Sequence, residues 1–137
     1  MNTENILNSI NKVSVIGLGY IGLPTAAILA SKKILVSGVD VSQDVIQTIN
    51  QGKAHFVEPE LVSMVKDCVA AGYLVATTEQ SPSDVFIITV PTPLISGNQP
   101  DLTYVYQAAR SIASVLKKGD LIILESTSPV GTTEQLA

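Results

Sequence analysis

Short apolar runs alternate with longer amphipathic stretches along most of this chain. The apolar runs are rich in β-branched residues, which is typical of strands buried on both faces of a parallel sheet. They predict strands at Val13–Ile16, Leu35–Val39, Tyr73–Thr77, Val85–Val90 and Leu121–Leu124. The stretches between them predict helices at Tyr20–Ser31, Gln43–Asn50, Glu60–Ala71 and Leu102–Leu116, with a further helix starting at Thr132.

This alternation predicts βαβ units and therefore a parallel sheet with helices on both faces. Right-handed crossovers then give a doubly wound, Rossmann-type α/β fold of five strands in the order 3-2-1-4-5. We expect residues 12–137 to form this domain after a polar tail over residues 1–11, with the sequence truncated just after the fifth strand. A last strand without a partner would expose an apolar edge, so we also expect self-association.

A glycine-rich segment follows the first predicted strand and opens the first helix. Its sequence, Gly17-Leu18-Gly19-Tyr20-Ile21-Gly22, fits the pattern G-x-G-x-x-G. Gly17 would permit a tight turn, Gly19 would let a pyrophosphate approach the backbone, and Gly22 would let the helix pack closely on the sheet. The N–H groups of Tyr20 and Ile21, at the positive end of the helix dipole, would bind the diphosphate.

Asp40 ends the second predicted strand, close to the spacing of about 20 residues at which dinucleotide-binding domains carry an acidic residue. Its carboxylate would accept hydrogen bonds from the ribose hydroxyls of adenosine and repel a 2′-phosphate. The sequence therefore predicts NAD rather than NADP as the cofactor. The alternative is that Asp40 only caps a helix or stabilises a turn.

Composition narrows the classes of partner. The chain has 137 residues, of which 46% are hydrophobic and 15% charged, and its net charge is −4. It lacks the basic surface that nucleic acid or an anionic membrane requires, and no apolar run reaches the roughly 20 residues of a membrane helix. The single cysteine, Cys68, lies on an apolar helical stripe; it is expected in the core and favours a cytoplasmic location. His55 is interpreted as a surface residue, and no cluster of metal ligands is found.

The segment Val15–Pro24 resembles the start of the UDP-glucose/GDP-mannose dehydrogenase family. Three later segments resemble the same family in order: Glu58-Pro59-Glu60-Leu61, then Val90-Pro91-Thr92-Pro93 with Pro100-Asp101-Leu102, then Glu125–Thr133. Their sequences are most similar to members that oxidise UDP-N-acetyl-D-mannosamine. The resemblance implies an NAD-dependent oxidation of the C6 alcohol of a nucleotide sugar to a carboxylate, with two NAD, in a homodimer or larger assembly. It places the nucleophilic cysteine and the sugar site in later parts of such chains, so this chain alone should bind NAD without turnover.

The resemblance also implies roles for single residues. Gly17, Gly19, Tyr20, Ile21, Gly22 and Asp40 match the family's pyrophosphate and ribose positions. Thr92 is implied beside the cofactor, Thr127 beside the cofactor and the water or alkoxide near the reacting carbon, and Thr133 at the cofactor from the last helix. Each of these threonines could instead be a cap or turn residue. Glu58 either lines the cofactor or a domain interface, or is an exposed carboxylate, which is favoured.

Two other functions would use the same site. Another NAD-dependent oxidoreductase, such as a 3-hydroxyacid dehydrogenase, shares the glycine segment and needs a later catalytic lysine. An NAD-sensing module would bind the cofactor without chemistry. The segments around Thr92 and Thr127 favour the nucleotide-sugar dehydrogenase over the hydroxyacid enzyme, whereas a second domain with a cysteine would distinguish it from a sensor.

Overall fold

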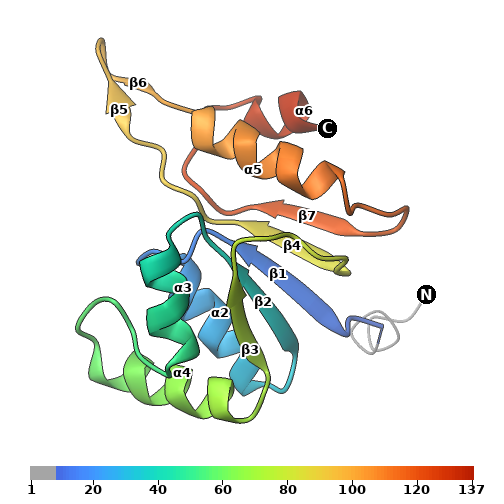
Figure 1. Ribbon diagram of the computed structural model, residues 1–137. Helices are drawn as coiled ribbons and strands as arrows, with labels where there is room; N and C mark the ends of the chain where they lie inside the picture. Colours follow the sequence, from blue (N-terminus) through green and yellow to red (C-terminus); the bar gives the residue numbers. More distant parts are fainter. Residues whose placement is uncertain (1–8) are drawn as a thin grey trace.

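A single parallel sheet forms the centre of the computed structural model, which describes residues 9–137 (Figure 1). The expected polar tail therefore lies largely outside the described residues. The strands are β1 (Lys12–Ile16), β2 (Leu35–Val39), β3 (Leu74–Thr77), β4 (Val85–Ile88) and β7 (Leu121–Leu124). Their order, β3-β2-β1-β4-β7, and the parallel pairing of every neighbour confirm the predicted Rossmann-type sheet of order 3-2-1-4-5.

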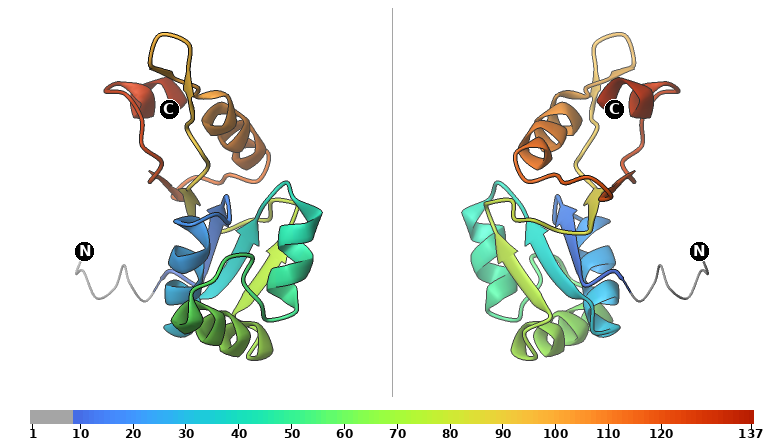
Figure 2. Two further views of the ribbon diagram at one scale, coloured as in Figure 1. Left: turned by 90° about the vertical axis from the view of Figure 1, so that its left-hand side faces the viewer. Right: turned by 90° about the vertical axis from the view of Figure 1, so that its right-hand side faces the viewer.

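Helices cover both faces of the sheet, as predicted (Figure 2). On one face, α2 (Gly22–Ser31), α3 (Gln43–Asn50) and α4 (Pro59–Ala70) bury their apolar sides in one core that also contains Val13 and Val15 of β1. On the other face, α5 (Thr103–Ala113) packs Ala108 and Ile112 against β4. The chain then passes through β7 to the short helix α6 (Thr132–Leu136). None of the helices within residues 9–137 is long and apolar enough to cross a membrane.

Three predicted boundaries between Val85 and Leu116 were wrong. Strand β4 ends at Ile88 rather than Val90, and the next residue, Thr89, donates its hydroxyl to the Gly17 carbonyl in the loop after β1. The expected loop over residues 91–100 contains a small antiparallel hairpin of β5 (Leu94–Ile95) and β6 (Gln99–Pro100). Helix α5 is shorter than predicted, although Asp101 Oδ1 does accept a hydrogen bond from Thr103 N in its first turn (2.9 Å).

Strand β7 lies at the end of the sheet and pairs only with β4. Leu121 is 52% exposed, and Ile122 and Ile123 are each 40% exposed. Ile123 pairs with Ile87, so it shares the sheet face that α2 covers further along the sheet. The apolar edge expected from the sequence is therefore exposed in the described structure.

The parallel direction of the five strands brings the loops that follow them to one edge of the sheet. Strands β1 and β4 are neighbours, but the chain runs from β1 towards β2 and from β4 towards β7. In doubly wound folds, ligands bind at the carboxyl edge where the strand order reverses in this way.

Candidate functional site

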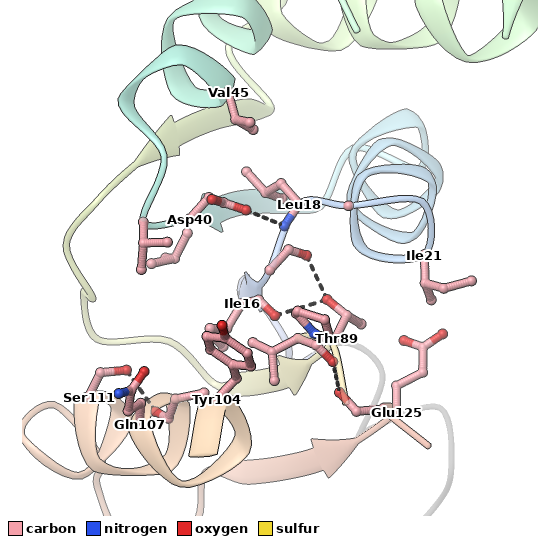
Figure 3. Close-up of a pocket in the computed structure, with 18 of the residues that line it drawn as sticks. Ile16, Leu18, Ile21, Asp40, Val45, Thr89, Tyr104, Gln107, Ser111 and Glu125 are labelled. Atoms are coloured by element: carbon pink, nitrogen blue, oxygen red, sulfur yellow. Dashed lines mark hydrogen bonds between the residues drawn. The ribbon is translucent and has the colours of Figure 1, made fainter. Parts of the chain in front are cut away.

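A groove of about 1210 Å³ occupies this carboxyl edge. Its walls are the loops after β1, β2, β3, β4 and β7, together with one side of α5. Figure 3 shows Leu18, Asp40 and Thr89 on the sheet side and Tyr104, Gln107 and Ser111 of α5 on the opposite wall. Sequence segments far apart in the chain therefore meet at one site.

The glycine loop is shaped by two glycines that have no room for a side chain. Gly17 has a φ of +95°, and a Cβ on it would lie 2.8 Å from the carbonyl oxygen of Thr89. A Cβ on Gly22 would overlap the carbonyl oxygen of Gly17 and lie 2.5 Å from Thr89 Oγ1. The predicted tight turn at Gly17 is confirmed. The close approach at Gly22 is to the loop itself and to Thr89, which ties the start of α2 to the end of β4.

Gly19 is different, because a Cβ there would meet nothing within 4 Å. Within residues 9–137, the backbone N–H groups of Gly19, Tyr20 and Ile21 donate no hydrogen bond to the chain. They lie at the N-terminus of α2, where the helix dipole favours an anion. Open space beside three available donors fits the pyrophosphate of a dinucleotide.

Of the two roles that the sequence left open for Asp40, the structure shows the turn-stabilising one, and the contact with ribose stays a prediction. Its Oδ2 accepts a hydrogen bond from Leu18 N (2.8 Å), and its Oδ1 accepts one from Ser42 N (2.9 Å). The carboxylate thus stabilises the turn into α3 and holds the glycine loop. A carboxylate offers about four acceptor positions, so capacity remains for ribose hydroxyls in the groove that Asp40 lines. None of the described residues lining the groove is Lys or Arg, so no cation there faces a 2′-phosphate.

Thr92 and Thr127 come together although they follow different strands. Their hydroxyl oxygens are 2.9 Å apart, and both residues line the groove. Ser126 supports this junction by donating from Oγ to the carbonyl oxygen of Val90 (2.8 Å). Thr133, in contrast, is exposed on α6 and does not line the groove, so its contact with a cofactor stays a prediction. Glu58 is also exposed and does not line the groove, in keeping with the favoured interpretation.

Sequence reasoning missed two features of the site. Thr89 is a nearly buried groove residue, and its only sequence signal is a polar residue at the end of an apolar strand. His55 is exposed, as expected, but it also lines the groove. Its neighbour Phe56 packs on Tyr20 of the glycine loop, with ring centroids 4.6 Å apart, and contacts His55 edge-on. No local pattern in the sequence predicts this aromatic contact.

Cys68 is a core residue, as predicted. Its Sγ lies 3.7 Å from the carbonyl oxygen of Ala27, and burial, assisted by the nearby Asp67 charge, raises the pKa of the thiol. A thiol with a raised pKa is a poor nucleophile at neutral pH. Among residues 9–137, no group of three or more His, Cys, Asp or Glu side chains is placed to hold a metal ion.

The fold and this groove define a Rossmann-type dinucleotide-binding domain. Residues 11–137 match the UDP-glucose/GDP-mannose dehydrogenase family, NAD binding domain. The chain belongs to this family, which confirms the resemblance seen in the sequence.

Named relatives agree with the family assignment. The chain is 60% identical over 91% of its length to an NDP-N-acetyl-D-galactosaminuronic acid dehydrogenase of Ralstonia nicotianae, and 60% identical over 96% to a UDP-N-acetyl-D-mannosamine dehydrogenase of Campylobacter jejuni. It covers 30% and 32% of those proteins. A solved UDP-D-ManNAc dehydrogenase of Pyrococcus horikoshii superposes with a TM-score of 0.87 at 47% identity, over 92% of this chain and 31% of that one. The chain thus spans about a third of the length of these proteins.

Proposed function

We propose that this chain binds NAD along the carboxyl-edge groove and serves as the cofactor domain of a nucleotide-sugar 6-dehydrogenase. The observation that carries the proposal is the order of the loops along the sheet edge. Because the strands run β2-β1-β4-β7, Asp40, the glycine loop, Thr92 and Thr127 follow one another in that order. This is the order in which a dinucleotide presents its adenosine ribose, its pyrophosphate and its nicotinamide half.

The reaction proposed for the whole protein oxidises the C6 alcohol of the sugar to a carboxylate, with water as the source of the second oxygen. The groove would hold NAD, and two NAD molecules bound one after the other would supply the hydride acceptors for the two oxidations. In this chain, the glycine loop binds the diphosphate and Asp40 orients the ribose. Thr127, held by Thr92, is placed to order a water or an alkoxide next to the reacting carbon.

This chain alone is proposed to bind NAD without turnover. The reaction of the family requires a cysteine nucleophile, and Cys68 is buried in the core outside the groove. The chain also spans only about 30% of its relatives' length. Sustained production of NADH by the 137-residue chain with any nucleotide sugar would refute this part of the proposal.

For the substrate we propose UDP-N-acetyl-D-mannosamine. Relatives named for UDP-N-acetyl-D-mannosamine and for an NDP-N-acetyl-D-galactosamine derivative match at the same identity, so the latter is the second candidate. Both are nucleotide-linked N-acetylhexosamines. We further propose a cytoplasmic protein, since the buried free thiol suits a reducing compartment. We also propose a homodimer or larger assembly for the whole protein, as the family resemblance implies.

Calorimetric titration of the chain with NAD, and separately with NADP, tests the cofactor proposal. We expect saturable binding of NAD and much weaker binding of NADP. Asp40→Asn should weaken NAD by about tenfold, because a hydrogen bond to a charged group is worth more than one to a neutral amide. Asp44→Asn removes the same charge from an exposed position outside the groove and should change neither affinity. A folded chain that does not bind NAD, or that binds NADP equally well, would contradict the proposal.

A further inference from the structure

Both polar groups of the peptide between Gly17 and Leu18, its N–H and its carbonyl, form hydrogen bonds with side chains. The two side chains follow two different strands. The N–H, on Leu18, donates to Asp40 Oδ2 after β2 (2.8 Å). The carbonyl oxygen, on Gly17, accepts a hydrogen bond from Thr89 Oγ1 after β4 (2.7 Å). We call this arrangement of Asp40, the Gly17–Leu18 peptide and Thr89 the peptide clamp; Figure 3 shows its two hydrogen bonds.

The Thr89 hydroxyl has one proton and lies near two carbonyl oxygens. The Ile16 carbonyl, 2.9 Å away, already accepts the N–H of Thr89 at 2.8 Å. Within residues 9–137, the Gly17 carbonyl has no donor other than the Thr89 hydroxyl. Gly17 is half-buried, and a carbonyl removed from water without a donor costs free energy, so the Thr89 proton is best used at Gly17.

Gly17 is the residue at which this peptide would otherwise be free to rotate. Its φ of +95° lies in a region that glycine enters easily, and glycine has the widest choice of neighbouring conformations. Rotation of the Gly17–Leu18 peptide would redirect the backbone that follows, including the N–H groups of Gly19 and Tyr20. The clamp therefore fixes the direction of the donors that face the groove.

We infer that Thr89 is a positioning residue for the dinucleotide, acting through the Gly17 carbonyl to hold the glycine loop in its binding conformation. This inference rests on the proposed binding of NAD in the groove. It assigns to Thr89 a role that needs the hydroxyl and not merely a side chain of that size. Thr89 is only 9% exposed, and its hydroxyl points to the glycine loop rather than into solvent.

The test compares Thr89→Val, which keeps the shape and removes the hydroxyl, with Thr89→Ser, which keeps the hydroxyl. NAD affinity is measured by calorimetry on the wild-type chain first. Thr89→Val should weaken NAD by about tenfold, the scale set by the loss of one hydrogen bond, whereas Thr89→Ser should bind within about twofold of wild type. If Thr89→Val does not fold, Thr89→Ala and Thr89→Ser form a second pair that differs only in the hydroxyl.

Ser83→Ala is the matched control. The Ser83 side chain is also buried and donates to a backbone carbonyl, that of Ser81 (3.2 Å), but it lies before β4, at the opposite edge of the sheet. It should leave NAD affinity unchanged even if it lowers the melting temperature. Equal loss of affinity in Ser83→Ala and Thr89→Val would indicate a general effect of stability and overturn the inference.

Two further readouts separate positioning from a merely structural role. ADP-ribose, which keeps the pyrophosphate, should lose affinity for Thr89→Val as NAD does, while adenosine, which lacks it, should bind both proteins alike in an NMR titration. Hydrogen exchange at the Leu18 amide should be faster in Thr89→Val than in Thr89→Ser. If the wild-type chain does not bind NAD, the proposed function fails; if it binds and Thr89→Val binds equally, the inference alone fails.

Discussion

Two alanine substitutions in the glycine loop should separate the stability of the domain from its affinity for NAD. Gly22→Ala places a Cβ against the carbonyl oxygen of Gly17 and 2.5 Å from Thr89 Oγ1. Gly19→Ala places the same methyl group in open space, with nothing within 4 Å. The two variants are chemically identical changes three residues apart, which makes each the control for the other.

The expected cost of Gly22→Ala follows from what the new methyl group meets. The Gly17 oxygen belongs to the backbone, and the Thr89 hydroxyl is held by two carbonyls, so neither rotates away without losing hydrogen bonds. Overpacking costs about 1–3 kcal/mol at ordinary core positions, and this site should reach about 3 kcal/mol. For a domain of 137 residues this lowers the melting temperature by about 10 °C.

Gly19→Ala should have the opposite signature. Gly19 is not among the glycines with a positive φ, so alanine adopts its backbone conformation without strain. Stability should hold or rise by up to about 0.5 kcal/mol, because alanine has fewer unfolded conformations to lose. The methyl group occupies the space that a phosphate would need, so NAD affinity should fall by about tenfold or more.

Circular dichroism during heating gives the two melting temperatures, and calorimetry gives the two affinities for NAD. A Gly22→Ala variant as stable as wild type would show that the junction between the glycine loop and Thr89 is looser than the structure has it. A Gly19→Ala variant that binds NAD normally would show that the pyrophosphate does not approach the backbone there.

Three further outcomes are expected. Phe56→Ala should weaken NAD severalfold and lower the melting temperature, because it removes a ring that packs both on Tyr20 of the glycine loop and against the main core; Phe56→Tyr, which keeps the ring, should bind normally. Asp84→Asn should lower the melting temperature at pH 7, because backbone N–H groups of Asn11 and Lys12 lower the pKa of this carboxyl. The difference from wild type should shrink as the pH falls, since the stability that the carboxylate adds is present above its unfolded pKa and lost as pH falls through the folded one. Ile123→Lys should reduce concentration-dependent association of the chain in sedimentation velocity. A wild-type chain that stays monomeric at every concentration would contradict self-association through the exposed β7 edge.

The strands and the glycine loop were predictable because their signals are local. Leu35–Val39 and Leu121–Leu124 are short apolar runs closed by polar residues, and both predictions match the structure to the residue. The G-x-G-x-x-G segment is constrained by sterics within one turn, so its conformation follows from its own residues. Even Asp40 could be singled out by its distance from the glycines alone.

Local signals could not predict the long-range contacts in the site, because the partners are remote in sequence. These contacts are made by Thr89, Asp40 and Phe56. The Thr89 hydroxyl bonds a carbonyl in the loop after β1, and this depends on β4 lying next to β1. Phe56 contacts Tyr20 from the loop before α4, which is remote from the glycine loop in sequence. The sequence suggested a turn or ribose role for Asp40 but not its hydrogen bond from Leu18 N, which depends on β2 lying next to β1.

These remote contacts have a common consequence for binding. A loop that must be ordered on binding loses conformational freedom at that moment, and the loss is subtracted from the affinity. Here the Gly17–Leu18 peptide is already fixed from both neighbouring strands before any ligand arrives. Glycine allows a phosphate to approach the backbone closely, but it also makes the loop flexible. The Asp40 and Thr89 side chains restrict that flexibility at the Gly17–Leu18 peptide. Asp40 belongs to the clamp and, in the proposed function, also contacts the ribose. Its substitution is therefore expected to change both the loop conformation and a direct contact with NAD, whereas substitution of Thr89 isolates the contribution of the preformed loop.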